Sequence, residues 1–341
     1  MCIIDVSHIT HILLDQGFRG CVQISKNKQT VFTGAYGYAD LSNQIPNTLE
    51  TKFATASAGK VFVAVSILQL IESGKLRLQN TLGNLLPLDW HEIDIDITVE
   101  QLLMHTSGIP DYFDESVMSE YEDLWKDFPN YKIRTNADLL PLFIDKPMMY
   151  PRGTKFQYNN TGFIVLAMII EAVTNQPFDI CLQSNVFSPR GMDSTGYYEL
   201  DRLPAKCANS YIFEKERDGF RTNIYSVDAK GTGAGGAFTT VGDIEKFWDA
   251  LSSYKLLTKK TTLEMLRCHS GSRETGYYGY GIWLAPAGDD SYNPYFQGCD
   301  PGVSFISSYD PNRNITITLV SNYGDNVWGL LKNIREYMSG T

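Results

Sequence analysis

Segments with strand character lie at both ends of this chain and apolar helical segments lie between them, and this order limits the possible folds more than any other feature. Two β-rich runs, Cys21–Ser25 and Thr30–Tyr36, flank a polar turn near the N-terminus, which is typical of a hairpin. Further strands are predicted near the C-terminus, over Tyr278–Leu284, Val303–Tyr309 and Asn314–Ser321. One sheet built from both ends, with helices packed beside it, explains this order better than tandem domains. The pattern therefore favours an α+β fold with a cleft between sheet and helices.

The middle of the chain changes from strand-like to helical periodicity. Predicted helices cover residues 3–16, 55–73, 161–173 and 325–338. Thr98 and Gln101 form a predicted capping box at the start of another helix. The length of 341 residues suffices for a large buried core and by itself allows one or two domains. Because one sheet is expected to take strands from both ends, we predict a single domain over residues 1–341. Its sheet lobe is predicted near residues 1–50 and 235–341, and its helical lobe near 51–234.

Charge and composition exclude several classes of partner. The formal net charge is −10 and no basic stripe is visible, so we expect no nucleic-acid partner. No apolar run approaches the ~18 residues of a membrane span, so we expect no membrane partner. The first sixteen residues lack the features of a secretory signal, which predicts a cytoplasmic protein. The expected partner is a small-molecule substrate. The six cysteines are scattered without metal-ligand spacing, so we predict no metal and no cofactor.

The first candidate for chemistry is the pair Ser57 and Lys60, which opens the most apolar predicted helix. Side chains three residues apart lie on the same face of a helix, so the amine can reach the hydroxyl. The positive end of the helix dipole favours an anion at Ser57 and disfavours a protonated Lys60. A neutral lysine can then act as the base that activates a serine nucleophile. A helix cap beside a solvated lysine is the alternative interpretation.

Tyr158 and Asn160 form the second candidate, just before the helix predicted over 161–173. A phenol near an ammonium group loses its proton more easily than a free phenol, so Tyr158 could pass a proton to a leaving group. Asn160 could hold either Lys60 or a substrate carbonyl. A core tyrosine followed by a helix-capping asparagine is the structural alternative.

The third candidate is the glycine-containing segment Phe296-Gln297-Gly298-Cys299 before the Val303 strand. A strand edge with glycine lets a substrate approach its backbone closely. An amide there, together with the amide of Ser57, would form a two-donor oxyanion hole.

Together these segments resemble the active site of the serine β-lactamase and penicillin-binding protein superfamily, with the class C β-lactamases and their esterase and D-aminopeptidase relatives as the nearest group. Further similarity lies in segments outside the three candidates. These segments are Gly34–Ala39, Leu102–Pro110, Gly233–Thr240 and Tyr278–Gly281. The resemblance spans about residues 18–338. It implies the β-lactamase/DD-peptidase fold, an antiparallel sheet flanked by helices with a mostly helical second lobe and the active site between them.

The resemblance implies a role for each matching residue. Ser57 would be acylated, Lys60 and Tyr158 would share the acid and base work, and Asn160 would position the substrate. The backbone amides of Ser57 and Cys299 would form the oxyanion hole, with the segment from Phe296 to Cys299 binding substrate. The family usually has Lys or His where this chain has Phe296, so efficient β-lactam hydrolysis is not expected, and Phe296→Lys is predicted to raise it.

The resulting hypothesis is a serine hydrolase that acts through an acyl-enzyme on a small ester, amide or D-amino-acid peptide. The alternative is a penicillin-binding acyl acceptor or binding module with little turnover. His105 invites a Ser-His-Asp triad, Gly231 to Gly236 fit a dinucleotide motif, and Asp94 with Asp96 could form a carboxylate pair. We interpret them instead as a structural histidine, a compact loop along the cleft and the wet face of a short strand.

Overall fold

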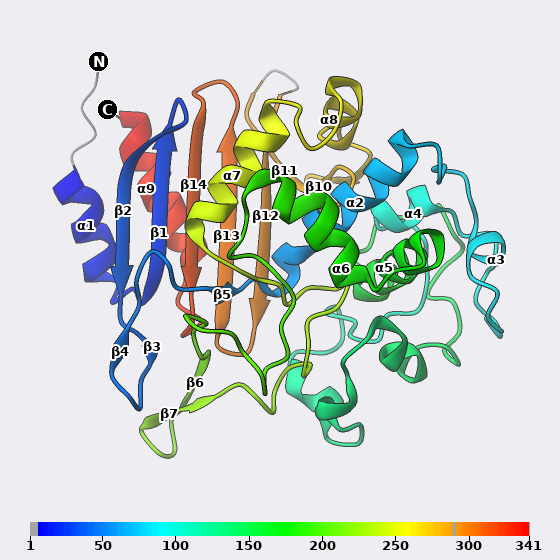
Figure 1. Ribbon diagram of the computed structural model, residues 1–341, viewed down its shortest axis with the longest axis horizontal. Helices are drawn as coiled ribbons and strands as arrows, with labels where there is room; N and C mark the ends of the chain where they lie inside the picture. Colours follow the sequence, from blue (N-terminus) through cyan, green and yellow to red (C-terminus); the bar gives the residue numbers. More distant parts are fainter. Residues whose placement is uncertain (1–5, 289–290, 341) are drawn as a thin grey trace.

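The computed structural model describes residues 6–288 and 291–340, and its centre is an eight-stranded antiparallel sheet (Figure 1). The order of strands across the sheet is β2 (Gln29–Tyr36), β1 (Gly20–Lys26), β14 (Ile315–Ser321), β13 (Val303–Asp310), β12 (Tyr292–Asp300), β11 (Trp283–Pro286), β10 (Gly276–Tyr278) and β9 (Ser270–Ser272). β1 lies between β2 and β14, so the two ends of the chain share one sheet. This confirms the predicted α+β fold.

The structure corrects one predicted strand. Tyr278–Leu284 was expected to run as a single strand, but it contains the end of β10 and the start of β11. Tyr278 pairs with Trp283, and Gly281 between them has a φ of +69°, in the left-handed region that glycine reaches without strain. The glycine-rich turn therefore folds this segment into a hairpin.

Helices and short elements surround the sheet. The helices are α1 (Val6–Asp15), α2 (Lys60–Glu72), α3 (Leu82–Leu85), α4 (Val99–Leu103), α5 (Asn160–Thr174), α6 (Phe178–Leu182), α7 (Val241–Ser252), α8 (Lys259–Met265) and α9 (Val327–Gly340). The short strands are β3 (Tyr38–Asp40), β4 (Ile45–Pro46), β5 (Phe53–Ala54), β6 (Tyr211–Glu214), β7 (Gly219–Thr222) and β8 (Phe238–Thr239). The short helical turns are η1 (Ala56–Gly59), η2 (Tyr121–Trp125), η3 (Asn130–Lys132), η4 (Asn136–Leu142), η5 (Gln183–Phe187) and η6 (Ser188–Arg190). The capping box of Thr98 and Gln101 is confirmed at the start of α4.

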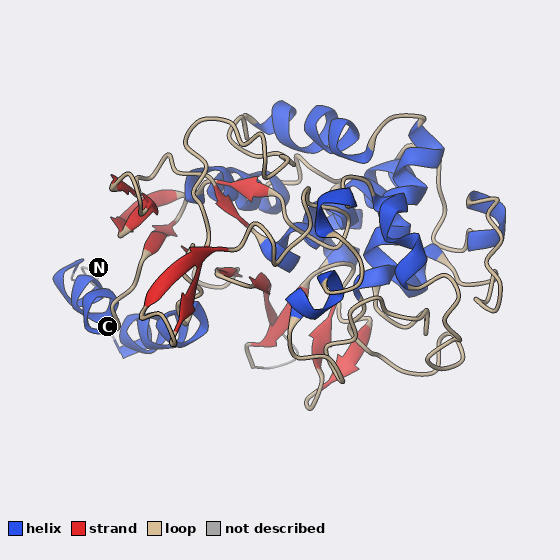
Figure 2. Ribbon diagram, turned by 90° about the horizontal axis from the view of Figure 1, so that it is seen from below, coloured by secondary structure: helices blue, strands red, loops and turns tan. Residues whose placement is uncertain are grey.

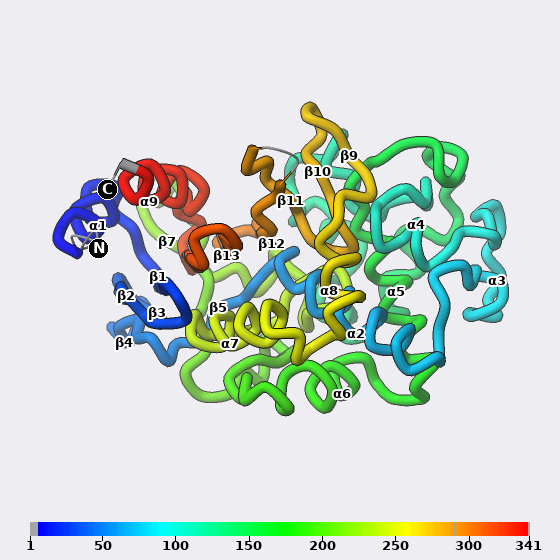
Figure 3. Tube along the Cα trace, turned by 90° about the horizontal axis from the view of Figure 1, so that it is seen from above, coloured from blue at the N-terminus to red at the C-terminus, as the bar shows by residue number. Residues whose placement is uncertain are grey.

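Helices cover the two faces of the sheet differently. α1 and α9 pack together on one face, where the rings of His8 and Tyr337 lie 4.3 Å apart (Figure 3). α7 lies on the opposite face, and the indole of Trp248 donates a hydrogen bond to Ser307 of β13. Side chains alternate between the faces of a strand, so β13 contributes Ile306 to one face and Phe305 to the other.

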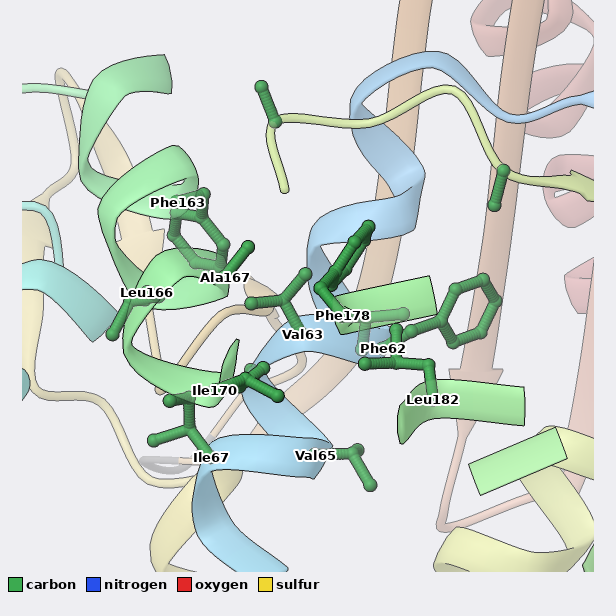
Figure 4. Packing of buried hydrophobic residues seen from close by; sticks show 14 of the residues in the cluster. Phe62, Val63, Val65, Ile67, Phe163, Leu166, Ala167, Ile170, Phe178 and Leu182 are labelled. Carbon is green, nitrogen blue, oxygen red and sulfur yellow. The ribbon is translucent and has the colours of Figure 1, made fainter. Parts of the chain in front are cut away.

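The helical lobe lies beside the sheet rather than on top of it (Figure 2). Its centre is the contact between α2 and α5, where Val63 and Ile67 lie beside Ala167 and Ile170 (Figure 4). All four side chains are fully buried, which places the starts of both helices on a rigid support. In the described part of the chain, no single helix is long and apolar enough to cross a membrane, although the bent pair 160–174 and 178–190 passes by length and composition.

Candidate active site

Ser57 lies in a strained turn at the junction of sheet and helical lobe. The preceding residue, Ala56, has a φ of +47°, which is unusual for a residue with a Cβ. The amide of Gly236 donates to the Ala56 carbonyl at 3.0 Å. Gly235 has a φ of +155°, and a Cβ there would come within 2.3 Å of the Ala56 oxygen. The glycine loop therefore holds the turn that presents Ser57 to a cavity, and its predicted place along the cleft is confirmed.

Lys60 is the first residue of α2 and its side chain is almost completely buried. Its Nζ donates to Ser57 Oγ at 2.9 Å, to Asn160 Oδ1 at 2.8 Å and to the Ala234 carbonyl at 2.5 Å. Burial lowers the pKa of Lys60 to about 8, although nearby carboxylates, chiefly Glu115, oppose this shift. At pH 7 roughly a tenth of such an amine is unprotonated and can act as a base, far more than for an ordinary lysine.

Asn160 connects Lys60 to the start of α5. Its Oδ1 accepts from Lys60 while its Nδ2 donates to the Phe113 carbonyl at 3.1 Å, so Asn160 holds Lys60 in this structure. Asn160 also lines the cavity, and its predicted contact with substrate stays a prediction. The helix cap is the neighbouring Asn159, whose side chain accepts from Gly162. Buried Asp111 accepts from the backbone amide of Asn160 at 2.8 Å, and burial raises the pKa of Asp111 to about 6.

Tyr158 lies over the same amine and against an aromatic wall. Lys60 Nζ is 5.0 Å from the centroid of its ring, and Trp283 stacks on the ring at 5.5 Å. Burial raises the pKa of Tyr158 well above its ordinary value, and the hydrogen bond with Ser57 only partly opposes this. The expectation of an easily ionised phenol is therefore wrong, because loss of solvent and the charge of Glu115 disfavour the phenolate. In the resting site Tyr158 is a neutral phenol and a proton donor.

His105 accepts hydrogen bonds from the residues on both sides of Tyr158, and none of its described hydrogen bonds involves Ser57. Its carbonyl accepts from the amide of Gln157 at 3.0 Å, and its Nδ1 accepts from the amide of Asn159 at 3.2 Å. The Nδ1 atom is thus an acceptor, which puts the ring proton on Nε2. Burial lowers the pKa of His105 well below its ordinary value, and its ring lies 4.5 Å from that of Tyr158. These contacts agree with the structural interpretation of this histidine rather than with a triad.

β12 packs directly against the turn η1, which contains Ser57. A Cβ on Gly298 would lie 2.3 Å from the Thr55 carbonyl and 2.6 Å from the amide nitrogen of Ser57, so only glycine fits. The predicted glycine strand edge therefore lies beside Ser57. Cys299 follows on the same strand and lines the cavity, and its amide remains the predicted second oxyanion donor.

Phe296 does not lie in the substrate site, which corrects that prediction. Its side chain is 3% exposed and stacks on Trp248 of α7 at 5.1 Å and on Phe305 at 6.0 Å. The Phe296 side chain lies in the hydrophobic core because α7 packs over this part of the sheet. A lysine there would be buried without a partner, so Phe296→Lys is no longer expected to improve β-lactam turnover. Gln297, by contrast, lines the cavity.

The cavity in front of Ser57 has a volume of about 860 Å³ and an acidic lining. The charged residues that line it are Glu115, Glu120, Glu122, Asp228 and Asp300, with no Lys or Arg among the described lining residues. Burial raises the pKa of Asp228 to about 7. Burial and the charge of Asp228 raise the pKa of Asp300 to about 8. The charge of Lys60 opposes the shift at Asp300 only in part, and no Lys or Arg of the described chain lines the cavity beside these two carboxyl groups.

The paired carboxylates considered in the sequence do not form the short strand expected of them. Residues 93–97 form turns, and Arg152 pairs with Asp94 at 2.7 Å and with Asp96 at 3.6 Å. The alternation of isoleucine and aspartate arises because Ile93 and Ile97 are buried in turns.

Several residues of the site were missed by sequence reasoning. Asp111, Trp283 and Asp228 carry no local pattern, since each reaches the site only through tertiary packing. Asp300 adjoins the glycine segment, and its position next to a predicted oxyanion strand was a signal that could have identified it.

Comparison with known proteins gives a consistent family. A family model described as Beta-lactamase matches residues 7–336. The crystal structure of a penicillin-binding protein from Bacillus halodurans superimposes with a TM-score of 0.92 at 37% identity, covering 96% of this chain and 99% of that one. PbpX of Bacillus subtilis, which its name assigns to the penicillin-binding proteins, is 29% identical over 93% of this chain and 74% of its own length.

A third relative differs in its named activity. The teichoic acid D-alanine hydrolase of Staphylococcus aureus is 27% identical over 79% of this chain and 63% of its own length. The family match points to the same group of proteins as the sheet with its helical lobe and the Ser57–Lys60 pair. The chain belongs to the β-lactamase family, in the superfamily that serine β-lactamases share with penicillin-binding proteins.

Proposed function

We propose that this protein is a serine hydrolase that forms an acyl-enzyme on Ser57 and cleaves an ester or amide of a D-amino acid. The observation that carries the proposal is the buried Lys60 amine, 2.9 Å from Ser57 Oγ, with its pKa lowered to about 8. A core lysine without a chemical role costs stability, because its charge is taken out of water. The start of α2 therefore serves to activate the serine.

The geometry supports one order of proton movements. Neutral Lys60 takes the proton of Ser57 Oγ as this oxygen bonds to the substrate carbonyl carbon. The oxyanion then accepts from the amides of Ser57 and Cys299. The Tyr158 phenol protonates the departing alcohol or amine and regains a proton from the Lys60 ammonium. Water releases the acyl group by the same transfers in reverse.

The acidic lining favours an ammonium-bearing substrate. An ammonium group near Asp228 and Asp300 would neutralise the charge that now raises the pKa of Asp300. A D-alanyl ester carries such a group, and the S. aureus relative is named for D-alanine release. A substrate carboxylate, as in penicillins, would meet repulsion from the same wall.

A penicillin-binding acyl acceptor is the second candidate. It is favoured by the 37% identity to the B. halodurans protein, whose structure is described as a penicillin-binding protein. In that case Ser57 would be acylated, and the acyl group would remain because water is not activated.

Turnover of three probes separates the candidates. D-Alanine p-nitrophenyl ester, its N-acetyl derivative and a fluorescent penicillin are each incubated with the native protein and with Ser57→Ala. We expect sustained release of p-nitrophenol that requires Ser57 and is faster for the free ammonium form. Stable labelling by penicillin without ester turnover would favour the acyl acceptor. Ester turnover and penicillin labelling that are both the same in the native protein and in Ser57→Ala would refute both candidates.

A further inference from the structure

Gln297 and Trp328 meet at the edge of the cavity. Gln297 belongs to β12 and Trp328 to the first turn of α9, and both line the cavity. The indole Nε1 of Trp328 donates to Oε1 of Gln297 at 2.7 Å. An indole nitrogen can only donate, so the oxygen of the carboxamide must face Trp328. The amide nitrogen of Gln297 is therefore the end that remains to offer a donor.

We infer that Trp328 fixes Gln297 as a neutral hydrogen-bond donor, which takes an uncharged carbonyl oxygen of the substrate and discriminates against a carboxylate. This inference rests on the proposed function and names the chemistry of the group beyond the scissile bond. Gln297 lies two residues before Cys299, so its side chain is displaced by about 7 Å along the strand from the proposed oxyanion donor. A substrate group a few bonds from the scissile carbonyl would reach it.

The charges around Gln297 support an uncharged acceptor. The charged side chains that line the described cavity are all acidic. Arg221, the cation that pairs with one of them, is bound to Glu122 at 2.7 Å and to Glu214 at 3.1 Å. Lys60 lies behind Ser57, and its Nζ is already engaged by Ser57, Asn160 and the Ala234 carbonyl. Among the described residues, no positively charged group at the cavity is free to pair with a substrate carboxylate. A neutral carbonyl needs only the hydrogen bond from the amide nitrogen of Gln297.

A matched pair of inhibitors tests this discrimination. D-Alanyl-D-alanine and D-alanyl-D-alanine amide differ only in a terminal carboxylate or carboxamide. Their inhibition constants against Ser57-dependent hydrolysis of p-nitrophenyl acetate can be measured whether or not either peptide is cleaved. We expect the carboxamide to bind at least about tenfold more tightly to the native protein. Equal constants, tighter binding of the carboxylate, or no inhibition by either peptide would overturn the inference.

Substitutions at Gln297 and Trp328 test the residues themselves. Gln297→Met keeps the side-chain length without the donor and is expected to weaken carboxamide binding about 3–10-fold. Gln297→Lys is expected to reverse the preference toward the carboxylate, and an unchanged preference in this variant would contradict the assignment. Trp328→Phe should weaken carboxamide binding in the native background but not in Gln297→Met. The same effect in both backgrounds would show that Trp328 acts only through general packing.

The test separates this inference from the proposed function. Hydrolysis of p-nitrophenyl acetate that depends on Ser57, combined with no preference between the two peptides, would remove the donor subsite and leave the serine hydrolase intact. Hydrolysis that persists in Ser57→Ala would instead remove the proposed function.

Discussion

The two ends of the cavity are built in different ways. At the reacting end, Ser57 comes from the turn η1, and Lys60 and Asn160 are the first residues of α2 and α5. The Lys60 amine has three hydrogen-bond partners. At the opposite wall, Asp228 and Asp300 come from a loop and from a strand end. The charge of Asp228 contributes to the raised pKa of Asp300, and both residues line the cavity that a ligand can enter.

This difference indicates that proton transfer and substrate selection are carried by different parts of the structure. The groups that move protons stand on two packed helices, where small displacements are resisted by the core (Figure 4). The groups that would select a substrate lie on loops and a strand edge, where sequence changes disturb the core less. We therefore expect substitutions at the reacting end to abolish turnover. Substitutions around it should alter the pH dependence of turnover or the placement of the reacting groups.

The largest expected effect follows from Lys60→Met, which removes the base and keeps an unbranched apolar side chain in the buried site. We expect kcat for p-nitrophenyl acetate to fall about 10²–10⁴-fold, with the protein still folded by circular dichroism. A variant with native kcat would show that Lys60 is not the base and that the two ends of the cavity do not differ as described.

Gly298→Ala tests the close approach of β12 to the serine turn. The added Cβ would lie 2.6 Å from the Ser57 amide nitrogen, so the strand must shift and the oxyanion geometry with it. A misplacement of this size is expected to lower kcat/KM about 100-fold. Gly242→Ala is the matched control, because its nearest neighbour is the Thr240 hydroxyl at 3.9 Å. Similar activity of the two variants would contradict the assignment.

His105→Phe tests how Tyr158 is positioned. Phenylalanine keeps an aromatic ring but removes Nδ1, which leaves the amide of Asn159 buried without its acceptor. The free energy of unfolding in urea is expected to fall by about 1–3 kcal/mol. Because Tyr158 is displaced, kcat should fall more than KM rises. A loss of stability with native kcat would restrict His105 to a purely structural role.

Glu115→Gln gives the smallest effect and measures the electrostatic link between the two ends. Activity should rise with pH through the pKa of Lys60, near 8, because only the neutral amine accepts a proton. Glu115 is the largest charge that raises this pKa, so its removal should move the rising limb of kcat/KM to lower pH. Glutamine can still accept the bond from Asn160 Nδ2. A limb that stays in place or moves to higher pH would refute this link.

The reacting end could be predicted because its spacing is local. Ser57 in η1 and Lys60 at the start of α2 are three residues apart along continuous helical turns, and Tyr158 lies two residues before Asn160, the first residue of α5. Periodicity at the two ends of the chain likewise predicted one sheet built from both ends, and the structure shows that β1 pairs with β14 in it. The proposed boundaries between sheet lobe and helical lobe remain a prediction, as do the cytoplasmic location and the absence of a nucleic-acid partner.

The rest of the site depends on contacts that sequence spacing does not encode. Phe296 matches a motif position, yet packing against Trp248 removes it from the cavity. The shift in the pKa of Tyr158 depends on how far packing excludes water, which no local pattern reports. Trp328 and Gln297 are 31 residues apart and meet only because α9 starts beside β12.

The most direct measurement of the central claim is the site of the covalent adduct. The protein is quenched in acid during turnover of D-alanine p-nitrophenyl ester, digested, and the acylated peptide is identified by mass spectrometry. The account predicts the acyl group on Ser57, with much less of it in Lys60→Met. Cys299 is the internal competitor, because this exposed residue lines the same cavity, although partial loss of solvent around its thiol raises the pKa to about 11. An adduct on Cys299 that persists in Ser57→Ala would contradict the account.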